Sequence, residues 1–366
     1  MGRTKNIILY WPALLVLIVS FVFAIWRLSS FDGDPVGLAQ IGTRFQDGDP
    51  LGSEGYDGQF AYYIAQNPNP KEVRAKLDVP AYRYQRILYP LLARALALEN
   101  PSWIPWTLLI INLVSQLVGI LLFTRHLIEK NVPSRYALIY GLWVGLIVGI
   151  GADLFEPLAF ALIAAAWYAR SHRRWGMSYL LLLLALLTKE IAIAFWLAAL
   201  FTDLLKNPRG NQWKYALLTG FAFLAWQLWL WIEFGEPGLA SGGAMATAFE
   251  VFPYYGFLRI SEISVAAFIL FSIVFGPTII IPSILGLIAA IRRLMQKEST
   301  IHIWALLFNS LLITFLPHST FREPLGLLRV ATGMIFSIIW YAAHYRAWRP
   351  LNYAMFWIAF LALIVR

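Results

Sequence analysis

The feature that most constrains this chain is a series of apolar runs about as long as a bilayer is thick. The first, Ile7 to Trp26, is close to the ~20 residues that a membrane-spanning helix needs. The chain is 60% hydrophobic and 13% charged, whereas soluble domains are about 45–50% apolar and about 25% charged. The sequence therefore predicts an all-α polytopic membrane protein.

We expect about 11 transmembrane helices, which form a single transmembrane domain over residues 1–366. The expected spans are 7–26, 103–123, 137–151, 154–169, 177–188, 191–205, 213–233, 264–291, 301–316, 326–343 and 351–365. Two pairs of spans, joined at Asp153 and at Lys189, are so tightly connected that full crossing by each partner is left open. The first run exceeds the 7–15 apolar residues of a signal peptide and has no small-residue cleavage site after it, so we expect a retained helix.

Positive charge indicates the orientation. The net charge is +9, and in a membrane protein such an excess marks cytoplasmic loops and headgroup contacts rather than nucleic-acid binding. With the N-terminus inside, most Lys and Arg residues of the short loops fall on the inner side. The long first loop, residues 27–102, then lies on the outer side.

The stretch Gly55-Tyr56-Asp57-Gly58-Gln59-Phe60 is the strongest candidate for chemistry within that loop. Two glycines allow a tight turn that exposes Asp57, and the aromatic residues after it predict a short interfacial helix. A single carboxylate held just above a bilayer suits a general base. The alternative is that Asp57 only caps the helix that starts near Gln59.

Two other features of the loop leave alternatives open. Asp32-Gly33-Asp34-Pro35 and Asp47-Gly48-Asp49-Pro50 are typical of turns, and a paired-carboxylate metal site there is not favoured. Arg83 and Arg86, three residues apart, would share one helical face and hold a phosphate or carboxylate. They could equally extend to lipid headgroups.

The predicted topology places most other ionisable residues that interrupt apolar sequence on the same outer side. These are Asp153, Glu156, Lys189, Glu190, His318, Arg322, Glu323 and Arg329. Ionisable groups at membrane depth are costly and point to function by default. The alternative for Lys189 and Glu190 is a structural ion pair with one of the other ionisable residues.

The sequence lacks cysteine and several well-known motifs, and this excludes several kinds of functional site. With zero cysteines, disulfides, thiolate metal sites and a cysteine nucleophile are ruled out. Walker loops, glycine-rich dinucleotide turns, His-Glu-x-x-His pairs and Gly-x-Ser-x-Gly elbows are also missing. Acids mixed with Arg, Lys and His suit a substrate that carries both hydroxyls and a phosphate.

These motifs resemble the GT-C superfamily of integral-membrane glycosyltransferases. The Gly-Tyr-Asp-Gly-Gln phrase with Tyr62-Tyr63-Ile64-Ala65 is similar to the first-loop motif of that group, and residues 83–92 resemble a phrase of bacterial relatives of the GPI mannosyltransferases. Glu156-Pro157-Leu158 and Thr188-Lys189-Glu190 sit where the group carries polar residues. The resemblance covers roughly the first 200 residues best, judged by motif order, and residues 322–329 more loosely.

The resemblance implies transfer of a sugar from a polyprenyl-phosphate-linked donor to an acceptor hydroxyl of a glycan, lipid or protein. It implies a bacterial inner membrane, a cytoplasmic N-terminus and an extracytoplasmic site with Asp57 as general base. The candidate donor-phosphate ligands are Arg83, Arg86, Lys189, Arg322 and Arg329. The candidate substrate contacts and supports are Tyr56, Gln59, Asp153, Glu156, Glu190, His318 and Glu323.

No cofactor is expected, and a divalent metal is not favoured because the first-loop acid is single where many relatives carry a pair. Two alternatives come from other classes: a transporter, flippase or polymerase of lipid-linked saccharides, and a non-catalytic scaffold of a glycan-assembly complex. Gly235 to Gly256 is either a mobile loop over the site or an ordinary connector.

Overall fold

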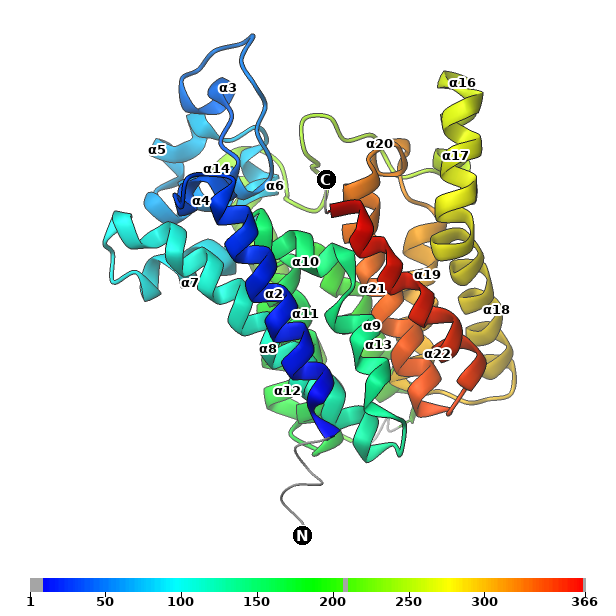
Figure 1. Cartoon of the computed structure of the whole chain (residues 1–366). Helices are drawn as coiled ribbons and strands as arrows, with labels where there is room; N and C mark the ends of the chain where they lie inside the picture. The colour runs from blue at the N-terminus through cyan, green and yellow to red at the C-terminus, as the bar shows by residue number, and fades with distance from the viewer. Residues whose placement is uncertain (1–8, 207–209, 365–366) are drawn as a thin grey trace.

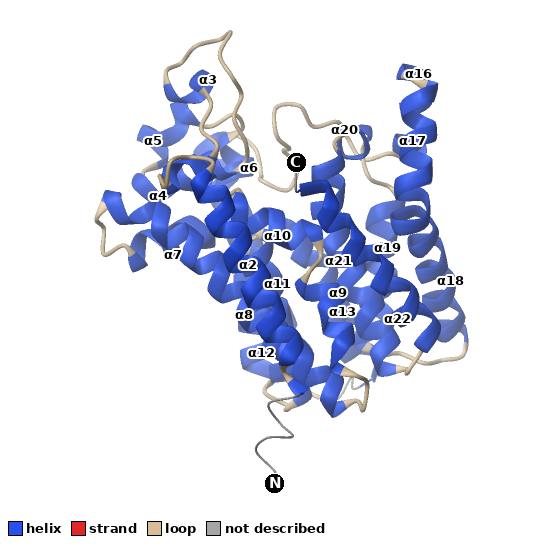
Figure 2. Ribbon diagram, viewed as in Figure 1, coloured by secondary structure: helices blue, strands red, loops and turns tan. Residues whose placement is uncertain are grey.

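The computed structural model describes residues 9–206 and 210–364, and within these ranges every regular element is a helix (Figures 1 and 2). The start of the first predicted span, with Arg3 and Lys5, lies outside the described residues, as do Arg209 and Arg366. The expectation of an all-helical membrane protein is confirmed.

Five helical segments of the described chain are long and apolar enough to cross a membrane. They are α2 (Trp11–Ser29), η3 with α8 (Pro101–Trp103, Ile104–Glu129), α14 (Gln212–Phe234), α17 to α18 (Val265–Phe275, Gly276–Ile280 as the π-helical η6, Ile281–Met295) and α21 (Pro324–His344). A sixth is counted if α9 and α10 form one span bent by 51°.

The remaining predicted spans are helical but shorter. They correspond to α11 (Glu156–Ser171), α12 (Trp175–Leu186), η5 and α13 (Glu190–Ala192, Ile193–Lys206), α19 (Ile301–Thr314), and α22 with η7 (Trp348–Ala354, Met355–Ile364). A 12-residue helix such as α12 is ~18 Å long, against a hydrocarbon core of ~30 Å. The helices therefore lie where the apolar runs predict them, and fewer than eleven have the length of a full crossing.

A bent segment packs closely on the most buried long helix. The η4, α9 and α10 segment (Ser134–Tyr136, Ala137–Gly141, Val144–Gly151) bends near Trp143. The Trp143 indole donates hydrogen bonds to the Leu328 carbonyl (3.1 Å) and the Thr332 hydroxyl (3.0 Å) of α21. Because α21 is buried along most of its length, its side chains are held rigidly from Arg329 near its start to His344 at its end.

Short helices fill the first loop and gather at one end of the bundle (Figure 1). They are η1 (Pro35–Ala39), α3 (Thr43–Gln46), α4 (Gly58–Gln66), α5 (Pro70–Val73), η2 (Arg74–Lys76), α6 (Pro80–Tyr84) and α7 (Leu88–Leu96). The loop after α14 crosses this end toward α15 (Tyr255–Leu258), α16 (Ile260–Ile263) and α20 (His318–Arg322). The same end therefore brings together the first loop and the start of α21.

Candidate functional site

Two glycines set the position of Asp57. Gly55 has a φ of +67°, which L side chains rarely adopt. A Cβ on Gly58 would lie 2.3 Å from the Ala152 carbonyl oxygen, so α4 approaches the α10–α11 connection as closely as backbone allows. Asp57 occupies the N-cap position of α4 but makes no side-chain capping bond. The capping alternative is therefore wrong for its carboxylate, which points to other partners.

The Asp57 carboxylate is held between two arginines from distant parts of the chain. Arg83 Nη1 lies 2.8 Å from Oδ1, and Arg329 Nη2 lies 2.8 Å from Oδ2. The Asp57 side chain is 24% exposed, whereas each arginine side chain is only 6% exposed. Burial by itself raises the pKa of Asp57, but Arg83 and Arg329 outweigh it, so this pKa lies well below its usual range.

Arg83 and Arg86 do come together, and both contact one aromatic ring. Each guanidinium contacts the Tyr82 ring, at 5.0 Å and 4.3 Å from the ring centroid. Arg83 also makes a bidentate pair with Asp78 (2.6 and 2.7 Å). Arg86 makes one with Glu190 (2.8 and 2.6 Å). Both arginines therefore bind carboxylates inside the protein instead of extending to headgroups.

Glu156 is the most deeply buried acid of the group and has two cationic partners. Its Oε1 accepts from Lys189 Nζ at 2.6 Å and from Arg329 Nε at 2.7 Å. The side chains of Glu156 and Lys189 are 0% and 4% exposed. Arg329 thus joins Glu156 to Asp57, and the structural ion pair with another ionisable residue, expected as one alternative for Lys189, is present with Glu156 as the partner.

The Asp57 cluster, as we name it, consists of four acids and four cations. Its members are Asp57, Asp78, Glu156, Glu190, Arg83, Arg86, Lys189 and Arg329. They come from the first loop, the start of α11, the α12–α13 connection and the start of α21. The formal charges cancel, which is how so many ionised groups can be placed at low exposure.

Tyr56 and Glu323 extend the cluster toward α20. Arg329 Nη1 donates to the Tyr56 hydroxyl at 3.0 Å, and that hydroxyl donates to Glu323 Oε1 at 3.3 Å. The guanidinium of Arg329 also lies 5.3 Å from the Tyr56 ring centroid. Burial, with smaller contributions from Glu323 and Asp57, raises the pKa of Tyr56 to about 12 although Arg329 opposes this. The Tyr56 hydroxyl therefore stays protonated, and it helps to position Arg329 by accepting a hydrogen bond from it while donating one to Glu323.

Four residues singled out from the sequence lie apart from the ion pairs. Gln59 is buried and braces the turn by bonding the Gly42 amide and the Glu54 carbonyl. The His318 imidazole contacts the Gly256 carbonyl at 3.0 Å. Arg322 is exposed and makes no ion pair with any residue that the structure describes. Asp153 is fully buried, and neither of its oxygens has a hydrogen-bond partner among the described residues.

Asp78 and Tyr82 belong to the site although no sequence motif identifies them as site residues. Asp78 follows a polar connector and carries no motif, so only its bidentate contact with Arg83 reveals it. Tyr82 stands beside Arg83 in Tyr-Arg-Tyr-Gln-Arg, and this alternation of aromatic and cationic residues could have indicated a shared ring. The amide of Ala244 also bonds Asp78 Oδ2 at 3.3 Å, which brings the loop after α14 against the cluster.

The two Asp-Gly-Asp-Pro phrases make turns. Asp34 Oδ1 accepts from the Val36 amide and Asp49 Oδ1 accepts from the Leu51 amide, each at 2.9 Å. In the described ranges, no group of three or more His, Asp or Glu side chains could hold a metal ion.

No protein-family model, curated protein or solved structure matches the chain. Function is therefore inferred from the charges and distances of the Asp57 cluster, together with the resemblance of its motifs.

Proposed function

We propose that this protein is a membrane glycosyltransferase of the GT-C type. It moves a sugar from a polyprenyl-phosphate-linked donor to an acceptor hydroxyl on a glycan, lipid or protein. The single observation that carries the proposal is the Asp57 carboxylate, partly exposed and held between the buried guanidinium groups of Arg83 and Arg329. A carboxylate can take the acceptor's proton, and guanidinium groups bind phosphate in the same geometry as carboxylate.

The proposed reaction is a single displacement at the anomeric carbon. The acceptor oxygen forms a bond to that carbon as the bond from the carbon to the donor phosphate oxygen breaks. The acceptor proton passes to an Asp57 oxygen, and polyprenyl phosphate leaves with the bonding electron pair. Arg329 and Arg83 offset the charge that builds on the departing phosphate, which is where preorganised cations contribute most.

The ion pairs of Asp57 with Arg83 and Arg329 imply an order of binding. While both arginines hold Asp57, its lowered pKa makes it a weak base. A donor phosphate that takes over a guanidinium group would remove that stabilisation and raise the basicity of Asp57. Each arginine keeps a negatively charged partner when it releases Asp57. Arg83 stays paired with Asp78, and Arg329 stays paired with Glu156. Donor binding therefore precedes activation of the acceptor.

The proposed topology has 11 membrane-associated helices with the N-terminus cytoplasmic. The Asp57 cluster then lies on the extracytoplasmic face of a bacterial inner membrane, where lipid-linked sugar donors are available. The shorter helices α10 to α13 meet at the cluster, and broken helices of this kind are tolerated where protein surrounds them.

The decisive experiment compares Asp57→Asn with Asp78→Asn. Both changes remove one carboxylate partner of Arg83, but only Asp57 is exposed toward a substrate. We expect Asp57→Asn to lower sugar transfer in native membranes about 10²–10⁴-fold, the usual contribution of a general base. Asp78→Asn should keep most of the activity. Equal transfer by Asp57→Asn and the wild type would remove Asp57 from the mechanism.

Identifying the co-purifying lipid tests the donor and the alternative together. We expect mass spectrometry of the protein purified from native-like membranes to detect a polyprenyl-phosphate hexose or pentose, and less of it in Arg329→Gln. An intact polyprenyl-pyrophosphate oligosaccharide in its place, with no new glycosidic bond formed, would favour the flippase or polymerase.

A further inference from the structure

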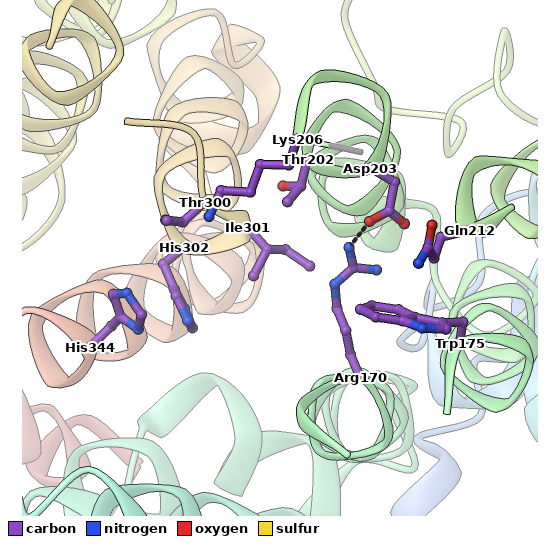
Figure 3. Close-up of a pocket in the computed structure, with 10 residues that line it drawn as sticks. All are labelled: Arg170, Trp175, Thr202, Asp203, Lys206, Gln212, Thr300, Ile301, His302 and His344. Carbon is purple, nitrogen blue, oxygen red and sulfur yellow. Dashed lines mark hydrogen bonds and ion pairs between the residues drawn. The ribbon is translucent and has the colours of Figure 1, made fainter. Parts of the chain in front are cut away.

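A cavity of about 340 Å³ is lined by ten residues (Figure 3) and lies at the other end of α11 from Glu156 of the Asp57 cluster. It is lined by the ends of α11, α13 and α21 and by the starts of α12, α14 and α19. Glu156 and Arg170 stand in the first and last turns of α11, about 21 Å apart at 1.5 Å per residue. The cavity is therefore separate from the Asp57 cluster.

The charged side chains of the cavity give it positive character. Arg170 and Asp203 form an ion pair with side chains 9% and 7% exposed, and the Tyr179 hydroxyl bonds the second Asp203 oxygen at 2.5 Å. Both oxygens of the acid are thus engaged. Lys206 adds a further cation, and it makes no ion pair within the described part of the chain. Because three helices begin and three end here, their dipoles oppose one another. The charged side chains therefore decide the sign of the electrostatic potential in the cavity.

Buried nitrogen atoms without partners line the cavity, with Arg170 on one side and His302 and His344 on the other (Figure 3). Among the described residues, Arg170 Nη1, His302 Nδ1 and His344 Nδ1 have no hydrogen-bond partner. Arg170 and His302 are each more than nine-tenths buried, and the rings of His302 and His344 lie 4.3 Å apart. Buried donors are normally satisfied, so a guanidinium N–H left open in a cavity indicates a missing acceptor, and an open imidazole nitrogen can bond an acceptor in the tautomer that protonates it.

We infer that this cavity binds a phosphate group, with Arg170, Lys206 and His302 as its ligands. A phosphate offers several acceptor oxygens and one or two negative charges, which match the open donors and the uncompensated lysine. The cavity is a site additional to the proposed transferase centre and does not depend on it.

The surroundings offer two sources for that phosphate. Exposed apolar side chains flank the cavity on α12, α13 and α14, including Met177, Leu205 and Leu218, and lipid acyl chains would cover such a surface. Basic pockets between helices near the cytoplasmic surface bind anionic headgroups. Soluble phosphate is the other source.

Native mass spectrometry of the full-length protein in detergent tests the site directly. Phosphatidylglycerol is titrated against phosphatidylcholine, and inorganic phosphate is added in excess as a competitor. We expect a phosphatidylglycerol adduct whose affinity falls about tenfold in a Lys206→Gln/His302→Phe variant. Phenylalanine keeps an aromatic ring beside His344 and has no ring nitrogen atoms. The matched control is Lys214→Gln, an exposed lysine on α14 that does not line the cavity.

The two sources give different outcomes. Adducts that survive excess phosphate identify a lipid headgroup. Displacement by phosphate, with phosphate raising the melting temperature of the wild type but not of the double variant, identifies the soluble anion. Equal phosphatidylglycerol binding by the wild type, the double variant and Lys214→Gln, without any effect of phosphate, overturns the proposal. If the double variant does not fold, Lys206→Gln alone carries the test because Lys206 is exposed.

Discussion

The two ends of this bundle contain polar groups that are arranged in opposite ways. At the Asp57 cluster, four acids and four cations pair with one another, and the formal charges cancel. In the cavity at the other end, one acid is fully engaged while nitrogen atoms of Arg170, His302 and His344 stay open. The helices α11 and α21 connect the two ends.

The two arrangements differ in what a ligand must do in order to bind. A cluster whose charges are mutually paired holds its segments together, and a phosphate that binds Arg83 or Arg329 must exchange partners with Asp57. A cavity with open donors can take its ligand with no exchange. We therefore expect loss of the most buried acid of the cluster, Glu156, to lower stability, and substitutions around the cavity to affect mainly ligand affinity.

The largest expected effect is at Glu156. Glu156→Ala leaves Lys189 with an uncompensated charge at low exposure and leaves Arg329 with Asp57 as its remaining acidic partner. Loss of one member of a buried ion pair costs about 3–5 kcal/mol, so the free energy of unfolding should fall by about that amount in denaturant titration. Glu129→Ala breaks the exposed pair with Arg125 and serves as the control that should change little. Similar values for both variants would show that the cluster does not hold the fold together.

The second largest loss of stability is expected for Gly58→Ala. Its Cβ would meet the Ala152 carbonyl oxygen at 2.3 Å, and relief of such overpacking costs ~1–3 kcal/mol. Because α4 would move away from the α10–α11 connection, Asp57 should shift and sugar transfer should fall as well. Gly276→Ala, where a Cβ meets nothing within 4 Å, is the matched control. A fully active and stable Gly58→Ala would contradict the close approach.

Asp203→Asn tests whether the cavity binds an anion. It removes the negative charge beside Arg170 but keeps a side chain that the Tyr179 hydroxyl can bond. We expect a loss of about 1 kcal/mol in stability together with tighter binding of phosphatidylglycerol, because the positive charge around the cavity rises. Weaker lipid binding in this variant would argue against an anion site.

The smallest expected effect is the pH dependence of the Asp57 ion pairs. The folded pKa of Asp57 lies below the unfolded value, which is about 3.9. The stabilisation is therefore present above about pH 4 and is lost as the pH falls below that value. The difference in melting temperature between the wild type and Asp57→Asn should be largest near pH 7 and should narrow in acid. A difference that widens in acid would reverse the sign of this pKa shift.

Local patterns were enough to predict much of the fold and part of the cluster. Apolar runs predict helices because their length and composition leave no other way to satisfy the backbone in lipid. The Gly55 and Gly58 spacing predicts a tight turn at Asp57, and Arg83 and Arg86 lie close enough in sequence to share a neighbour. Asp78 and the open cavity could not be predicted in this way, since no local pattern distinguishes their residues.

The sequence by itself determined that this protein is helical and membrane-embedded, and that charges such as Lys189 and Glu156 need partners, since burying an unpaired charge is costly. Only the tertiary structure decided which partners they have. Glu190 follows Lys189 directly, yet it pairs with Arg86, while Lys189 pairs with Glu156. Arg329 enters the cluster, and Arg322, seven residues earlier, stays exposed. Ion pairing depends on distances of a few ångströms between side chains, and helix packing sets those distances.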